Sequence, residues 1–282
     1  MTRLVRSILL SAFSVLALAG APFPETTRAA PPEACASVAE RNAQSAGRAR
    51  TERARRQRAR RARRARYRRL VRSWHRRASR DDVRAWRAQD PRPLVLRPVG
   101  RGEQYELLPD AEGRFGAADL ARVEEALRHR DGRSHAIHPR LVELVYRAAR
   151  EFAAPYVTVV SGYRPDRSSS RHTQGRAIDI VLPGISDRRL SRYLFRQGFV
   201  GVGIYTGSGF VHLDVRARSY FWIDRSAPGQ PQRLRRILPA RAARNDADAR
   251  ARGEEVVADL ENTGETPEDA PSAEDVVAEP GG

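Results

Sequence analysis

The sequence predicts an α+β fold with a largely antiparallel central sheet flanked by helices, in a single domain with disordered segments at both ends. Two observations predict it. Between residues 93 and 240, helical and strand patterns follow each other in mixed order, and a short Gly-containing loop of hairpin type joins the last two predicted strands. Outside this range the sequence changes to runs of a single charge, which bury too little apolar surface to fold alone.

Each element of the domain rests on a local pattern. Short segments rich in β-branched and apolar residues, with turn residues between them, are predicted as strands: 94–96, 104–108, 156–160, 177–182, 202–205 and 210–215. Segments with apolar residues at helical spacing are predicted as helices: 117–129, 139–152 and 187–196. Gly132, Pro155 and Gly198 follow these helices, and such residues commonly end a helix.

The charge of the chain is concentrated in two segments of opposite sign. The formal net charge of the 282 residues is +18, and residues 41–80 hold 18 arginines and one acid. From Asn245 onward, twelve acidic residues face only two arginines. We therefore interpret residues 22–92 as an Arg-rich low-complexity linker, partly helical or disordered, and residues 241–282 as an acidic disordered tail. The domain occupies residues 93–240.

The first 21 residues have the pattern of a signal peptide. Arg3 and Arg6 precede an apolar run, and Ala17-Leu18-Ala19 and Ala19-Gly20-Ala21 are both small-x-small candidates for the cleavage site. We expect an exported protein of the periplasm or cell envelope. No other apolar run approaches the roughly 18 residues of a membrane-spanning helix, so we expect no transmembrane segment after signal cleavage. The single cysteine, Cys35, excludes an internal disulfide scaffold.

The Arg-rich run at residues 48–77 is composed of good helix formers, but it has no continuous apolar stripe to hold it on a core. Its charge indicates an anionic partner. Nucleic acid, an anionic envelope polymer and the chain's own acidic tail all fit that charge. For an exported chain we favour the envelope polymer or the tail, and we do not expect nucleic acid.

Two histidines and one aspartate form a candidate metal site. His172 lies seven residues before Asp179, and Gly175 between them permits a tight turn. His212, on a separate strand, supplies a third ligand from a remote part of the chain. Two histidines with one carboxylate are a ligand set of catalytic zinc, because they leave a coordination position for water. Such a zinc ion lowers the pKa of its bound water to roughly 7 and polarises a carbonyl, which suits amide hydrolysis.

Two further residues complete the candidate site. Asp214 shares a strand face with His212, because side chains at i and i+2 point to the same side. It is either a general base for metal-bound water or a partner that orients a ligand. Arg164 follows a buried strand and is a candidate for binding a substrate carboxylate or a developing oxyanion.

These motifs resemble the zinc D-Ala-D-Ala carboxypeptidases and murein endopeptidases, whose metal-site fold is shared with lysostaphin and hedgehog domains. The resemblance covers roughly residues 93–224. Four motifs in this order carry it: Ser161-Gly162-Tyr163-Arg164, Ser170-x-His172-x-x-Gly175-x-Ala177-x-Asp179, Gly201-Val202-Gly203-x-Tyr205 and Phe210-Val211-His212-x-Asp214. The upstream stretch from Gly113 to Leu141 is similar to the exported, envelope-associated branch of the family.

The resemblance implies that His172, Asp179 and His212 are zinc ligands and that Arg164 binds the substrate or transition state. Many members place an acid or a histidine two or three residues before the last ligand, where this chain has Phe210 and Gly209. Neither can move a proton, so Asp214 is the candidate that remains for this role.

Three functions therefore compete. The first is an exported, monomeric zinc metallopeptidase that cleaves peptidoglycan stem peptides or cross-links as a D-amino-acid endopeptidase or carboxypeptidase. The second is a catalytically silent member of the family that binds zinc and cell-wall material. The third is a polyanion-binding protein in which the Arg-rich run is the active part.

Overall fold

The computed structural model describes residues 32–165, 170–227, 230 and 233–259. The predicted signal sequence, residues 1–21, lies outside the described residues. The helices and strands follow one another along the chain in this order: α1 (Pro32–Trp74), α2 (Arg80–Arg87), β1 (Leu94–Pro98), β2 (Tyr105–Leu107), α3 (Ala117–Leu127), α4 (Pro139–Glu151), β3 (Val157–Ser161), β4 (Ala177–Val181), α5 (Asp187–Leu194), the 3₁₀ turn η1 (Phe195–Gln197), β5 (Val200–Tyr205), β6 (Phe210–Val215), β7 (Tyr220–Asp224), β8 (Leu234–Ile237) and α6 (Pro239–Ala251).

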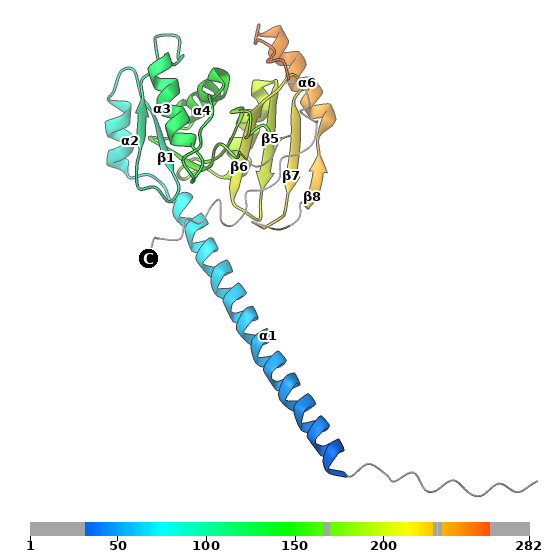
Figure 1. The fold of residues 1–282 in the computed structure, drawn as a ribbon. Helices are drawn as coiled ribbons and strands as arrows, with labels where there is room; N and C mark the ends of the chain where they lie inside the picture. Colours follow the sequence, from blue (N-terminus) through cyan, green and yellow to red (C-terminus); the bar gives the residue numbers. More distant parts are fainter. Residues whose placement is uncertain (1–31, 166–169, 228–229, 231–232, 260–282) are drawn as a thin grey trace, which may run out of the picture. The chain divides into compact units, whose positions relative to one another are not determined.

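The strands form one sheet in the order β2-β1-β3-β4-β6-β5-β7-β8, with helices beside it (Figure 1). Only the pairs β1–β3 and β5–β7 are parallel among the neighbours in this order. The predicted α+β class with a largely antiparallel sheet is therefore confirmed. Strands β7 and β8 and helix α6 extend the predicted set of elements.

The two faces of the sheet are covered differently. Alternate residues of a strand point to opposite faces, and Val211, Leu213 and Val215 of β6 pack into the main core with helices α3, α4 and α5. The intervening residues Phe210, His212 and Asp214 face the other side. There a second apolar cluster contains Tyr205, Phe210 and Trp222 together with Tyr67 and Trp74 of α1.

The chain divides into two compact units, residues 1–60 and 61–282, which we describe separately. In the first unit α1 is exposed throughout residues 40–60. In the second unit its last turns are packed: Tyr67 and Trp74 are buried, and Leu70 and Val71 lie against the same cluster. The expected absence of an apolar stripe in residues 48–77 is therefore wrong for residues 67–74, where four apolar residues follow helical spacing.

The boundary predicted for the acidic tail also differs from the structure. Residues 239–251 form α6, and its side chains Ala242, Asn245, Asp246 and Ala249 are buried. The helix packs because Asp246 accepts hydrogen bonds from the backbone N–H groups of Phe199 and Ser219, at 2.8 Å each. A buried carboxylate that is fully hydrogen-bonded can hold a helix without a hydrophobic face. Residues 260–282 lie outside the described part of the chain.

Among the described residues, none of the helices combines the length and apolar character that a membrane span requires.

Candidate metal centre

The three predicted metal ligands are brought together by neighbouring strands and one loop. Asp179 on β4 and His212 on β6 are direct partners across the antiparallel pair. His172 lies in the loop before β4, which turns at Gly175 with φ +64°. A Cβ atom at Gly175 would lie 2.0 Å from the Ala136 carbonyl oxygen, so only glycine fits this turn.

One donor atom of each residue faces a common point. His172 Nε2 lies 3.2 Å from His212 Nδ1, His212 Nδ1 lies 2.9 Å from Asp179 Oδ1, and His172 Nε2 lies 3.6 Å from Asp179 Oδ1. Tetrahedral zinc with bonds of about 2.0–2.1 Å separates its ligand atoms by about 3.3 Å. The side chains are at most 1% exposed, and the donor set fits a zinc ion.

The other polar atom of each ligand is held by a different group. His172 Nδ1 donates to the Gly162 carbonyl at 2.6 Å, which fixes the tautomer with Nε2 directed at the cluster. His212 Nε2 donates to Asp214 Oδ2 at 2.9 Å, and Asp179 Oδ2 accepts a hydrogen bond from Arg164. Such partners orient metal ligands. The geometry therefore leaves one donor per residue for an ion.

The charges around the cluster shift the pKa values of its members. Burial lowers the pKa of His172, and the nearby Arg164 guanidinium lowers it further, so the neutral form that binds metals is favoured. Burial would also lower the pKa of His212, but hydrogen bonds and charges from Asp179 and Asp214 raise it to about 9. Burial opposes ionisation of Asp179, yet Arg164 and His172 hold its pKa well below the usual range.

Asp214 is fully buried and surrounded by donors. Its carboxylate accepts hydrogen bonds from His212 Nε2, from the backbone N–H of Gly201 at 3.1 Å, and from Arg216, whose Nε lies at 2.6 Å. It therefore lies on the side of His212 that is turned away from the donor cluster. Of the two roles considered from the sequence, this position favours orienting His212 over acting as a general base.

Arg164 lies beside the cluster rather than apart from it. Its Nε donates to Ser161 Oγ at 2.9 Å and its Nη2 donates to Asp179, and the residue is 5% exposed. The guanidinium therefore orients the metal-facing carboxylate and adds a positive charge beside the cluster.

Two glycines of β5 make room for this arrangement. A Cβ atom at Gly201 would lie 2.0 Å from Asp214 Oδ2, and one at Gly203 would lie 2.4 Å from the Trp222 ring. The Trp222 ring in turn lies 5.2 Å from the His212 ring, measured between centroids. The Gly-x-Gly pattern is therefore needed so that Asp214 and Trp222 can support His212 from the same sheet face.

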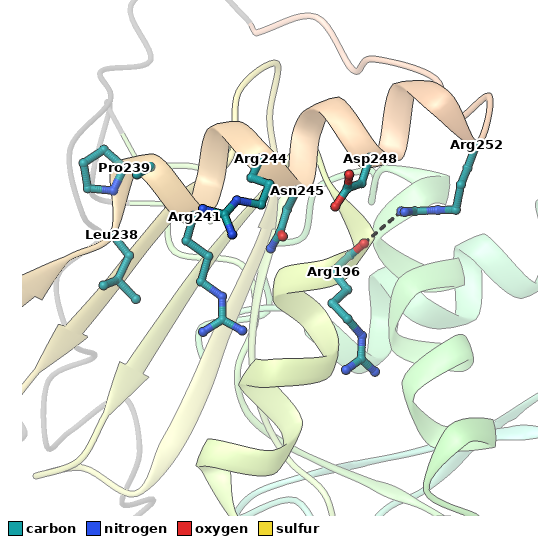
Figure 2. A pocket seen from close by; sticks show the side chains of 9 residues that line it. Arg196, Leu238, Pro239, Arg241, Arg244, Asn245, Asp248 and Arg252 are labelled. Carbon is teal, nitrogen blue, oxygen red and sulfur yellow. Dashed lines mark hydrogen bonds between the residues drawn. The ribbon is translucent and has the colours of Figure 1, made fainter.

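Sequence reasoning missed two arginines of the site, Arg171 and Arg216. Both are buried and both lie near Asp214, with Arg171 Nε 3.6 Å from Asp214 Oδ1. The sequence could have indicated Arg216, because residues 212, 214 and 216 have the i, i+2, i+4 spacing that places side chains on one face of an extended segment. A surface pocket between α6 and η1, lined by Arg196, Arg241, Arg244 and Arg252, contains none of the donor residues (Figure 2).

The comparisons with known proteins match the part of the chain that contains this site. Residues 86–220 match the family model described as peptidoglycan L,D-endopeptidase MepK. The chain is 29% identical over 140 residues to the protein of that name from Escherichia coli strain K12. The aligned region covers 44% of this chain and 76% of the relative. The proteins of the same name from Escherichia coli O157:H7 and Shigella flexneri match with the same identity and coverage. No solved structure matches the chain.

The matched range contains the donor residues His172, Asp179 and His212 together with Arg164 and Asp214. The resemblance inferred from the four motifs is confirmed. Over residues 86–220, the chain is therefore similar to the peptidoglycan endopeptidases that these motifs resemble.

Proposed function

We propose that this protein is an exported zinc-dependent peptidase that hydrolyses amide bonds in peptidoglycan stem peptides or cross-links. The observation that carries the proposal is the donor set, in which His172 Nε2, Asp179 Oδ1 and His212 Nδ1 converge at zinc-like separations. The relatives are named L,D-endopeptidases, which favours an endopeptidase over a carboxypeptidase and a bond between an L- and a D-residue.

The chain's own residues prepare the site for this reaction. A bound zinc ion supplies an activated water at neutral pH and polarises the scissile carbonyl. Gly162 and Asp214 hold the two imidazoles in fixed orientations, and Arg164 holds Asp179 so that one carboxylate oxygen faces the ion. We further propose that Arg164 binds a substrate carboxylate or the developing oxyanion, because its guanidinium contacts the metal-facing carboxylate Asp179 directly.

The test combines metal analysis with cleavage of purified muropeptides followed by mass spectrometry. Wild-type protein should bind one zinc per chain and cleave a cross-linked muropeptide. His172→Ala, Asp179→Ala and His212→Ala should each lose stoichiometric zinc and activity, whereas His135→Ala, at an exposed histidine outside the cluster, should lose neither. Full zinc retention in all three variants would show that the site is elsewhere. Zinc binding without cleavage would favour the catalytically silent alternative.

Asp214→Asn separates the two roles of Asp214. If Asp214 orients His212, the variant should bind zinc about 10–100-fold more weakly. If Asp214 were the general base, zinc affinity should stay at the wild-type level while turnover falls by about 10²–10⁴. Metal titration and turnover at saturating zinc distinguish these outcomes. We expect the first.

We also propose that the Arg-rich part of α1 binds an anionic envelope polymer. The helix is exposed over residues 40–60, and the eight arginines there outnumber two acids, Glu40 and Glu52. Deleting residues 32–60 removes eight of the 18 arginines in residues 41–80 and should weaken salt-sensitive retention on an immobilised anionic polymer while leaving zinc content unchanged. Retention equal to that of the full chain would contradict this proposal.

A further inference from the structure

The segment that follows α6 is held on the domain by arginines. The Glu254 carboxylate accepts hydrogen bonds from Arg147 at 2.9 Å and from Arg140 at 3.3 Å, and its backbone N–H donates to the Ala249 carbonyl at 3.1 Å. Both arginines belong to α4. The Glu254 side chain is 19% exposed, so this contact is partly shielded from water.

Further along, the same segment reaches the loop that carries the His172 ligand. Arg176 Nη1 donates to the Ala258 carbonyl at 2.6 Å, and Arg171 Nη2 donates to Asp259 Oδ1 at 3.3 Å. Between these contacts and Glu254, Val257 packs against the main core. Arginine side chains of the domain therefore contact both ends of the segment 254–259. A separate acidic peptide could bind through contacts of the same kind.

This contact connects directly to the candidate metal centre. Arg171 immediately precedes His172, and its Nε lies 3.6 Å from Asp214 Oδ1. The other oxygen of Asp214 lies 2.9 Å from His212 Nε2. One arginine side chain thus separates the Asp259 carboxylate from the residue that orients a metal ligand.

The electrostatics at this position suit a carboxylate. Arg171 is 2% exposed with Asp259 against it. Burial lowers the pKa of Arg176, the Asp259 charge raises it, and the charge of Arg171 lowers it again. Two guanidinium groups close enough to repel each other are stabilised by an anion between them, and arginine binds carboxylates with directed, charge-assisted hydrogen bonds.

We propose that Arg171 and Arg176 form a subsite for a free carboxylate of an acidic peptide, and that residues 254–259 occupy it as an internal competitor of the substrate. The proposal rests on the proposed peptidase function in one respect, namely that the peptide is the substrate. An attached segment has an effective concentration of order millimolar, so it raises the apparent KM for an acidic substrate without any change to the donor residues.

A binding experiment tests the subsite without relying on catalysis. The probe is a fluorescein-labelled, C-terminally amidated peptide with the sequence of residues 253–259, and its binding to full-length protein is measured by fluorescence anisotropy. Glu254→Gln/Asp259→Asn, which weakens the internal segment at full chain length, should bind the probe at least about tenfold more tightly than wild type.

Two controls separate a subsite from general attraction to a basic protein. Adding Arg176→Gln to the double variant should reduce probe affinity at least about tenfold, because one of the two guanidinium groups is removed. Adding Arg241→Gln, an exposed arginine of the pocket in Figure 2, should leave affinity unchanged. A scrambled probe with the same composition should bind the double variant more weakly than the true sequence.

The proposal is overturned if the double variant shows no saturable binding, or if the scrambled probe or the Arg176→Gln variant binds equally well. A kinetic arm adds a second readout: the double variant should cleave an acidic muropeptide with lower KM and unchanged kcat, and an unchanged KM counts against competition. If no form of the protein cleaves any muropeptide but the probe binds as expected, the proposed function fails while the carboxylate subsite stands.

Discussion

The last turns of α1 and helix α6 contact the domain with the same residue spacing but with different chemistry. Four inward positions in each follow the i, i+3, i+4, i+7 pattern of one helix face: Tyr67, Leu70, Val71 and Trp74 in α1, and Ala242, Asn245, Asp246 and Ala249 in α6. The first set is large and apolar. The second combines small residues with polar ones that hydrogen-bond to the domain.

This difference predicts different tolerance to substitution. Burial of apolar area is non-directional, so α1 should accept another large apolar side chain at an inward position. Hydrogen bonds to buried backbone groups need an acceptor at a fixed place, so α6 should not accept a change that removes the acceptor. Aromatic contacts hold the basic helix, whereas a buried carboxylate holds the other.

The largest effect is expected at Trp74. This side chain is 6% exposed and its ring meets the Tyr67 ring edge-on, with centroids 6.0 Å apart. Truncation of a buried tryptophan to alanine costs about 3–5 kcal/mol, and Trp74→Ala should lower the free energy of unfolding by that amount or release the end of α1. Urea unfolding followed by circular dichroism measures the first outcome, and hydrogen exchange in residues 61–74 measures the second.

Two companion variants make the Trp74 result interpretable. Trp74→Phe should retain most of the stability, since a large apolar ring remains. Arg69→Ala, at an exposed position one turn earlier, should change the free energy of unfolding by less than about 0.5 kcal/mol. An equal loss in Arg69→Ala would mean that contacts of the exposed arginine side chains, and not the aromatic stripe alone, hold α1.

Asp246→Ala is expected to have the next largest effect. Its carboxylate accepts from Phe199 N, from Ser219 N and from Ser219 Oγ. Each buried donor left without an acceptor costs about 1–3 kcal/mol, and water admitted by the smaller side chain recovers part of this, so we expect a loss of about 2–3 kcal/mol. Thermal or urea unfolding at neutral pH provides the measurement.

Asp246→Asn and Asp248→Ala sharpen this result. The first keeps one acceptor oxygen and should be intermediate, whereas the second removes an exposed carboxylate of the same helix and should be nearly neutral. If Asp248→Ala were as destabilising as Asp246→Ala, the buried hydrogen bonds would not be what holds α6.

These two helices also show how far the sequence predicts the fold. Strands such as 177–181 and 210–215 are evident because β-branched and apolar residues dominate them locally. The α1 stripe escaped detection because four apolar residues lie at the end of a long arginine-rich run. Helix α6 escaped because a buried Asn–Asp pair has the composition of a solvated segment, and only tertiary contacts reveal its hydrogen-bond partners.

The candidate site divides along similar lines. The donor residues were predicted, because histidine and aspartate at motif spacing carry a chemical signature in the sequence itself. The sequence left two roles open for Asp214 and did not indicate Arg171, because both depend on which buried charges meet across strands and loops. The residue type of Asp214 limits the chemical roles that its side chain can have, and its hydrogen-bond partners in the folded chain select among those roles.

A smaller effect is expected from Tyr67→Phe. The Tyr67 hydroxyl donates to the Ser208 carbonyl at 2.7 Å, and burial raises the pKa of this phenol. If α1 is held by apolar contact, losing this hydrogen bond should lower the free energy of unfolding by about 1 kcal/mol, the usual net contribution of one such bond. A loss as large as that of Trp74→Ala would show that α1 depends on a polar anchor, as α6 does.

The smallest effect concerns a third helix end, the start of α4, where a titratable residue serves as cap. His138 is the N-cap, and its Nδ1 accepts a hydrogen bond from the backbone N–H of Arg140 at 3.3 Å. Burial, followed by the charges of Arg176 and Arg140, lowers the pKa of this imidazole below its ordinary value of about 6.5. The unfolded chain therefore binds more protons near pH 6 than the folded one, and stability falls as the pH drops from 7 through the ordinary pKa.

His138→Asn keeps a good capping side chain but cannot titrate. Its free energy of unfolding, measured by urea titration at intervals from pH 7 to pH 5, should decline less steeply than that of wild type. His135→Asn, which removes an exposed imidazole that caps no helix, is the matched control and should keep the wild-type profile. A His138→Asn profile parallel to wild type would mean that protonation does not disturb this cap. In that case the stability contributed by the α4 cap would not depend on the charge of its side chain. The cap would then be insensitive to pH, as the apolar contact of α1 is expected to be.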